Sequence, residues 1–140
     1  MNVTVSGGGS AGFVSRDNPY NAGNFSGSGG LTWTVDLGDV NNFKFSASGK
    51  LLHVEFDLVT TTVGGTLVNT FLQVTIPGGF LPSQTCQVPC LCQNNSAVWE
   101  NAYCIISQGN PLLAFRRIAG DWTASANNTR LDFNQSFFIN

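Results

Sequence analysis

The residue types best suited to chemistry lie on one predicted strand, residues 51–58. His53, the single histidine of the chain, shares a strand face with Glu55 and Asp57, because every second side chain of a strand points the same way. An imidazole with two carboxylates suits a divalent cation or an acid–base pair. One strand supplies only part of a coordination shell, and no second cluster lies nearby in the sequence. We therefore expect a solvated face or a subunit-contact face, with no metal and no other cofactor.

Four cysteines, at Cys86, Cys90, Cys92 and Cys104, allow three interpretations. Structural zinc sites use paired C-x2-C or C-x4-C spacings, which this set lacks. A disulfide requires an oxidising compartment. A free cysteine is commonly a small buried apolar side chain. We favour the third interpretation, and Cys86 with Cys104 is the pair to test for a disulfide.

Motifs for nucleophilic catalysis or phosphate binding are not recognisable. Ser28 lies between two glycines, but in a Gly-rich segment rather than at the strand-to-helix elbow of a hydrolase. The Gly-rich stretches 7–9 and 27–30 do not lead into a helix, as a phosphate-binding loop would. The sequence therefore predicts neither a hydrolase with a nucleophile elbow nor a nucleotide-binding protein with a phosphate-binding loop.

A hydrolase of cell-surface polysaccharide is a rival hypothesis, which requires two carboxylates about 5 to 9.5 Å apart in a cleft. The candidate pairs are Glu55 with Asp57 and Glu100 with Asp121. Neither pair has further support in the sequence. We expect that the chain is not an enzyme.

Two other groups of side chains allow both a structural and a functional interpretation. Arg116 and Arg117 are adjacent in a predicted strand, so one points inward or to an interface and needs a carboxylate partner such as Asp121 or Asp132.

The three tryptophans are Trp33, Trp99 and Trp122. They could form a sugar-stacking surface, but strand tryptophans usually belong to the core, and the apolar neighbours of Trp33 place it there. A receptor-binding or glycan-binding protein would need Trp99, Tyr103 and Trp122 exposed together.

Length and composition limit the class of protein. A chain of 140 residues is expected to form one domain, and its charged fraction of 10% is far below the usual ~25%. The net charge of -2 comes from scattered residues, so we expect no nucleic-acid partner. We also expect no membrane span, since no apolar run approaches ~20 residues, and no signal peptide. The chain is expected to be made in a cytoplasm.

Residues 1–30 are predicted to be an extended Gly-rich N-terminal arm. Glycine loses the most backbone entropy on ordering, so such a segment does not fold alone. It is either a flexible linker or an arm that lies across a neighbouring subunit. The apolar anchors of the second hypothesis are Val3, Val5, Phe13, Val14, Tyr20 and Phe25.

Residues 31–140 are predicted to be an antiparallel β-sandwich, jelly-roll-like, of about eight strands. Period-two alternation and Gly, Pro and Asn turn signals mark the strands as 31–36, 43–47, 51–58, 69–76, 87–92, 98–107, 112–118 and 130–139. The β-branched run 59–63 is expected to connect two strands, and 126–128 to form a turn. Turn spacing of ~8 to 12 residues is typical of sandwiches and barrels.

Four stretches together resemble small jelly-roll β-sandwich proteins of tailed-bacteriophage virions. They are PYNAGNF at 19–25 leading to GLTWTV at 30–35, TTTVGG at 60–65, VTIPGGF at 74–80, and DWTASANNT at 121–129. The resemblance covers roughly residues 19–140. It implies a non-enzymatic protein of the virion exterior that associates as a homotrimer, either on the capsid or at a tail-fibre tip.

Between these two places, the expectation is the capsid. A fibre tip normally follows a shaft, whereas only the Gly-rich arm precedes this domain. We therefore expect a capsid decoration (cement) protein that binds the major capsid protein on the capsid exterior and stabilises it. The alternative is a tail-fibre or receptor-binding protein that recognises a host glycan or receptor.

Overall fold

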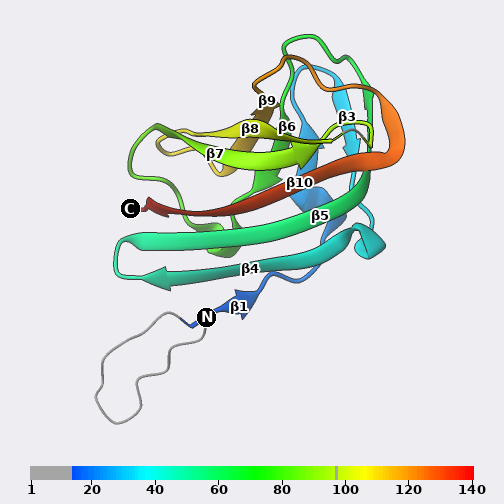
Figure 1. Cartoon of the computed structure of the whole chain (residues 1–140). Helices are drawn as coiled ribbons and strands as arrows, with labels where there is room; N and C mark the ends of the chain where they lie inside the picture. The colour runs from blue at the N-terminus through cyan, green and yellow to red at the C-terminus, as the bar shows by residue number, and fades with distance from the viewer. Residues whose placement is uncertain (1–13, 97) are drawn as a thin grey trace.

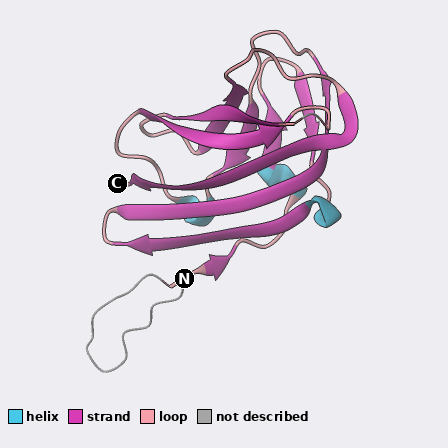
Figure 2. Ribbon diagram, viewed as in Figure 1, coloured by secondary structure: helices cyan, strands magenta, loops and turns pink. Residues whose placement is uncertain are grey.

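The computed structural model describes residues 14–96 and 98–140, most of which lie in β-strands (Figures 1 and 2). The strands are β1 (Arg16–Asp17), β2 (Phe25–Gly27), β3 (Leu31–Thr34), β4 (Val40–Ser48), β5 (Leu51–Gly65), β6 (Leu72–Thr75), β7 (Cys86–Gln93), β8 (Trp99–Ile106), β9 (Leu112–Arg117) and β10 (Ser125–Phe138). Three short 3-10 helices, Ala22–Asn24, Leu37–Asp39 and Pro77–Gly79, lie between them, in cyan in Figure 2. Within the two described ranges, no helix has the length and apolar character to cross a membrane.

The strands form one antiparallel sheet that curls around a core. Hydrogen-bonded neighbours follow the order β1-β4-β5-β10-β7-β8-β9-β6-β2, and β3 pairs with the end of β5. Figure 1 shows β5 and β10 side by side in the middle, with β4 beyond one and β7 beyond the other. The prediction of an antiparallel all-β chain is therefore confirmed. A division into two facing sheets, as in a sandwich or jelly roll, is not confirmed and stays a prediction.

The two longest strands bend part-way along, which allows a single sheet to curl. Thr60 of β5 has φ +46°, a rare value for a β-branched residue, and Asn127 of β10 has φ +57°. The register of β10 against β5 shifts between Ser125 and Thr129 and again before Leu131. Before the bend β5 pairs with β4, and after it β5 pairs with β3.

Both bends correct predicted boundaries. Residues 59–63, expected to connect two strands, lie inside β5, because β-branched side chains favour an extended backbone. Residues 126–128, expected to form a turn, are an irregularity within β10, where asparagine tolerates the left-handed conformation of a bulge. The described part of the chain has ten strands rather than about eight because β1 and β2 lie in the segment predicted as an arm.

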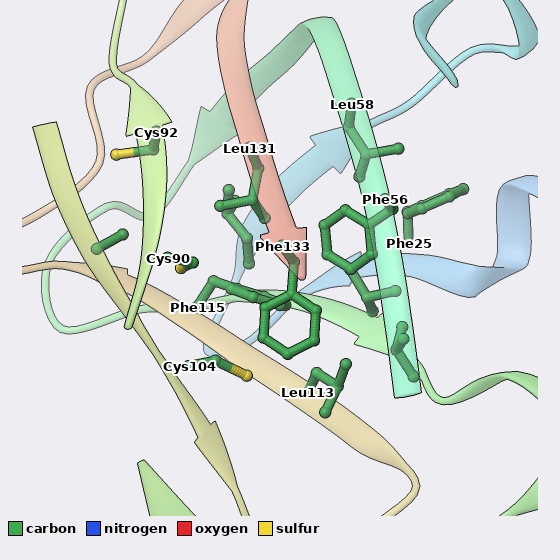
Figure 3. Close-up of a cluster of buried hydrophobic side chains, with 14 of the residues drawn as sticks. Phe25, Phe56, Leu58, Cys90, Cys92, Cys104, Leu113, Phe115, Leu131 and Phe133 are labelled. Atoms are coloured by element: carbon green, nitrogen blue, oxygen red, sulfur yellow. The ribbon is translucent and has the colours of Figure 1, made fainter. Parts of the chain in front are cut away.

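The core is rich in phenylalanine, and Figure 3 shows its centre. The ring centroid of Phe56 lies 5.4 Å from that of Phe133 and 5.6 Å from that of Phe115, so β5, β10 and β9 meet there. Phe43 adds a fourth ring, 5.3 Å from Phe56. Such pairs contribute ~0.5 to 1.5 kcal/mol each beyond the area they bury. These contacts hold the curled sheet together from inside.

Phe25 corrects the prediction of a partner-contacting arm. Its side chain is only 6% exposed and meets Trp33 edge-on at 5.7 Å, inside the core of its own chain. β2 pairs with β6, and Gly27 allows the tight return to β3 because a Cβ there would collide with the Leu31 carbonyl group. Phe25 is buried here because Trp33 and Phe43 leave an apolar place beside β6. The folded domain therefore includes residues before the predicted boundary at residue 30.

Candidate functional site

The outer face of β5 and β10 brings together the polar row predicted from the sequence and three residues of the last strand. His53, Glu55 and Asp57 alternate with fully buried residues, and their cross-strand partners on β10 are Ser136, Asn134 and Asp132, in that order. Directly opposed residues of antiparallel strands hold their side chains close together. This face is therefore the candidate functional site.

His53 forms a hydrogen bond to its cross-strand neighbour rather than to a carboxylate. Its Nδ1 lies 2.8 Å from Ser136 Oγ, and the ring tautomer decides which atom donates. Throughout residues 14–96 and 98–140, no three His, Cys, Asp or Glu side chains group closely enough to hold a metal ion. The row of His53, Glu55 and Asp57 thus reaches the same face as predicted, but it does not converge on one point.

Asp57 and Asp132 lie opposite each other with Arg130 beside both. Arg130 donates from Nη2 to Asp57 Oδ2 at 2.9 Å and from Nε to Asp57 Oδ1 at 3.1 Å, a bidentate pair. A longer contact of 3.4 Å joins Arg130 Nε to Asp132 Oδ1. The guanidinium also lies over the Trp99 ring, 4.8 Å from its centroid. Arg130 therefore links the carboxylates to β8.

The two carboxyl groups have different acidities. Burial raises the pKa of Asp132 to about 6, and the neighbouring Asp57 charge adds to this effect more than Arg130 offsets it. Burial alone would raise the pKa of Asp57 as well, but hydrogen bonds from Asp132 and Asn41 and the Arg130 charge hold it below its usual value. Two adjacent carboxylates of this kind share one proton near mildly acidic pH.

A hollow lies beside this pair, where the ladder between β10 and β7 ends. The two strands pair only from Arg130 opposite Gln93 to Asp132 opposite Leu91. Pro89 lies two residues before Leu91 in β7, and its carbonyl oxygen accepts a hydrogen bond from the Gln135 side chain at 3.0 Å, so this edge of Pro89 faces β10. Because proline has no N–H to offer on that edge, the ladder ends there.

The hollow has a volume of about 450 Å³. Its walls combine side-chain amides, carboxylates and apolar side chains, and its floor is formed by residues of the core. The residues around it are Asn42, Glu55, Phe56, Asp57, Pro89, Cys90, Leu91, Asn101, Asp132, Phe133, Asn134 and Gln135. It is the concave part of the candidate site.

The cysteines are packing residues, as the third interpretation predicts. All four are free thiols. Cys90, Cys92 and Cys104 are buried (Figure 3), and Cys86 is half-buried. Burial raises the pKa of Cys90 and of Cys92 to about 12, and it raises that of Cys104 well above the ordinary value. Neutral buried thiols are poor nucleophiles and poor metal ligands.

The tryptophans do not form the sugar-stacking surface of the rival hypothesis. Trp122 is only 1% exposed, and its Nε1 donates to the Phe115 carbonyl oxygen at 3.1 Å. Trp33 is a core residue as predicted, and its Nε1 donates to Thr61 Oγ1. Trp99 alone of the three is exposed. A surface that joins Trp99, Tyr103 and Trp122 is therefore wrong.

The adjacent arginines find carboxylate partners within the chain. Arg116 pairs with Asp121 at 2.9 Å, as predicted. Arg117 pairs with Glu100, a partner that the sequence did not suggest. The carboxylate pair Glu100 and Asp121 of the hydrolase hypothesis is thus engaged by arginines.

The predicted arm anchors have different environments. Val14 is 50% exposed, and Tyr20 is 38% exposed with its hydroxyl donating to the Val35 carbonyl oxygen at 2.9 Å. Phe25 is in the core, as described above. Val3, Val5 and Phe13 lie outside the described residues.

Comparison with known proteins found no matching family model, no matching curated protein and no matching solved structure. The site therefore rests on its own geometry. Sequence reasoning missed Arg130 and Asp132 as neighbours of Asp57, because only the register of β10 against β5 brings them together. Pro89 was the available signal for the hollow, since proline interrupts a central strand.

Proposed function

We propose that this chain is a non-enzymatic structural protein of a virion, a decoration (cement) protein that binds the exterior of a tailed-bacteriophage capsid as a homotrimer. The jelly-roll resemblance of its turn and strand motifs supports the virion part of the proposal. The partners of the folded chain are then other copies of itself and the major capsid protein. Its role is to stabilise the capsid through many weak contacts multiplied by symmetry.

The observation that carries the proposal is an apolar patch at one end of the outer face. Phe138 is 53% exposed and pairs across the strands with Leu51, beyond His53 on the same face. Leu81 is 39% exposed, and its carbonyl oxygen accepts from the Asn140 backbone N–H, which places it beside the end of β10. Exposed aromatic and aliphatic side chains that gather in this way are typical of protein interfaces. We call Leu51, Leu81 and Phe138 the end patch.

The charges of the chain support the same proposal. Only 10% of the residues are charged, and Arg116, Arg117 and Arg130 are each paired with a carboxylate of the same chain. A surface with so few unpaired charges loses little hydration energy when a partner covers it. The predicted subunit-contact row of His53, Glu55 and Asp57 continues from the end patch and belongs to this proposal.

The test compares the same change, an apolar side chain replaced by glutamate, at two exposed positions. Phe138→Glu puts a charge into the end patch, and Val68→Glu puts one at a position that is 66% exposed in the turn before β6. Phe138→Glu should abolish trimer formation and co-sedimentation with purified capsids, whereas Val68→Glu should leave both unchanged. Equal behaviour of the two variants would exclude the end patch as the contact.

The arm part of the proposal needs a shorter deletion than residues 2–30. Deleting β2 would remove Phe25 from the core, so loss of binding would report loss of the fold. Removing residues 2–13 leaves every described strand intact. The arm hypothesis predicts a folded protein that binds capsids more weakly, and full binding by the shortened chain contradicts it.

A further inference from the structure

The hollow between β7 and β10 shares Glu55 and Asp57 with the predicted subunit-contact row, but it lies apart from the end patch, which is farther along the same face. Its volume of about 450 Å³ falls in the ~300 to 1,000 Å³ range of small-ligand sites. Its shape comes from the backbone, since Pro89 ends the ladder with β10. A pocket that exists without side-chain rearrangement is prepared for a ligand.

The polar side chains around the hollow hold unused hydrogen-bonding groups. Asn42, Asn101 and Asn134 line it, and within residues 14–96 and 98–140 their side-chain amides make no hydrogen bond; the same is true of the Glu55 carboxylate. By contrast, Asn94 elsewhere in the chain donates to Thr123 Oγ1 and accepts from the Thr123 N–H. Each carboxamide offers donors and an acceptor together.

The charges around the hollow narrow the class of ligand. Glu55, Asp57 and Asp132 repel a phosphate, a sulfate or a carboxylate ligand. Arg130 already occupies Asp57 through two hydrogen bonds, and no three His, Cys, Asp or Glu side chains of the described residues group closely enough to hold a metal ion. A neutral ligand rich in groups that both donate and accept fits these side chains.

The apolar walls complete the match. Leu91, which is 47% exposed, and Pro89 form one rim, while Phe133 contributes to the floor. A sugar ring has hydroxyl groups at its edge and C–H groups on its faces, so it needs amides and apolar surface side by side. We propose that the hollow between β7 and β10 is a glycan-binding site in which Asn42, Asn101 and Asn134 bind the sugar hydroxyls.

The test is nuclear magnetic resonance of the full-length ¹⁵N-labelled chain. The probes are D-glucose, D-galactose, D-mannose and N-acetyl-D-glucosamine at millimolar concentration, followed by an array of bacterial polysaccharides. At least one probe should shift the side-chain amide signals of Asn101 and Asn134 in a saturable manner. Response to a monosaccharide indicates that one ring fills the site, and response to polysaccharide alone indicates an extended ligand; both outcomes support the proposal.

Two variants and a matched control test the position of the site. Asn101→Ala and Asn134→Ala each remove an exposed amide at the hollow and should weaken binding about tenfold, the loss expected for one hydrogen bond of ~1.4 kcal/mol. Gln108→Ala removes an exposed amide in the β8–β9 turn and should bind as the unchanged chain does. The backbone spectrum of each variant verifies that it is folded.

Two results would overturn the proposal. One is the absence of binding to every monosaccharide and every array polysaccharide. The other is binding that both hollow variants retain in full, or that shifts the Trp99 indole signal while the two asparagine amides stay fixed. Phe138→Glu provides the link to the proposed function: it should bind glycan normally even as a monomer, so the failure of one proposal does not imply failure of the other.

Discussion

Asp57 and Asp132 face each other across β5 and β10, and Arg130 neutralises Asp57 more fully than Asp132. Arg130 contacts Asp57 at 2.9 and 3.1 Å but Asp132 only at 3.4 Å. The proton shared by the two carboxyl groups therefore resides mainly on Asp132, in agreement with its raised pKa of about 6. At neutral pH, Asp132 loses this proton, and its buried charge then destabilises the folded state.

Asp132→Asn should stabilise the chain at pH 7. The folded pKa of about 6 lies above the ordinary value of 3.8, so the folded state holds a proton that the unfolded state loses, and stability falls as the pH rises from about 4 to about 6. The substitution removes this penalty, which is on the order of 1 kcal/mol after solvent screening, because the Asp132 side chain is 33% exposed. The lowered pKa of Asp57 has the opposite effect on stability. Its carboxylate stabilises the folded state above pH 3.8, and this stabilisation is lost as the pH falls below that value.

Urea unfolding of both proteins across this pH range measures the effect. The unchanged chain should lose stability between pH values of about 4 and 6, while Asp132→Asn should show a flat profile there. Parallel profiles would show that Asp132 does not carry the penalty.

Thiol reactivity tests the packing role of the cysteines. Cys90, Cys92 and Cys104 are buried, and the raised pKa values of about 12 for Cys90 and Cys92 keep them neutral at mildly alkaline pH. A disulfide reagent such as dithiobis(nitrobenzoate) should react rapidly with Cys86 at most, and with all four thiols after unfolding in urea. Rapid labelling of three or more thiols in the folded chain would contradict this account.

At the scale of elements, β2 is the part of the predicted arm that the fold cannot lose. Phe25→Ala should destabilise the chain by about 3 to 5 kcal/mol, the usual result for truncating a buried phenylalanine. Tyr20→Phe, five residues earlier, removes one hydrogen bond to Val35 and should cause a loss of only ~1 kcal/mol. Urea unfolding measures the free energy of unfolding of both variants. Equal decreases would mean that Phe25 contributes no more than a surface residue does.

Alternation along the chain predicts most strands, because a residue's direction within a strand depends only on its near neighbours. The faces of β5 and β10 follow from it directly, with Leu52, Val54 and Phe56 inward as expected. Local signals fail where one long strand bends: asparagines at 126–128 indicate a turn, yet Asn127 belongs to a bulge in β10. The pairing of Asp132 with Asp57 was not predictable, since strand order depends on contacts distant in sequence.

At the scale of the whole molecule, the last strand occupies the middle of the sheet. β10 lies between β5 and β7, so the candidate site combines residues of the last strand with residues from the middle of the chain. Its outer face then divides in two: the end patch around Phe138, and the hollow beside Asp132. The end patch suits a protein partner, and the hollow suits a small polar ligand.

The mass of the full-length protein in solution shows most directly whether the chain works as an assembled subunit. Native mass spectrometry or sedimentation equilibrium should give three times the chain mass of 14.9 kDa, and the Phe138→Glu variant should give the single-chain mass. A single-chain mass of 14.9 kDa for the unchanged protein at every concentration measured would contradict the claim.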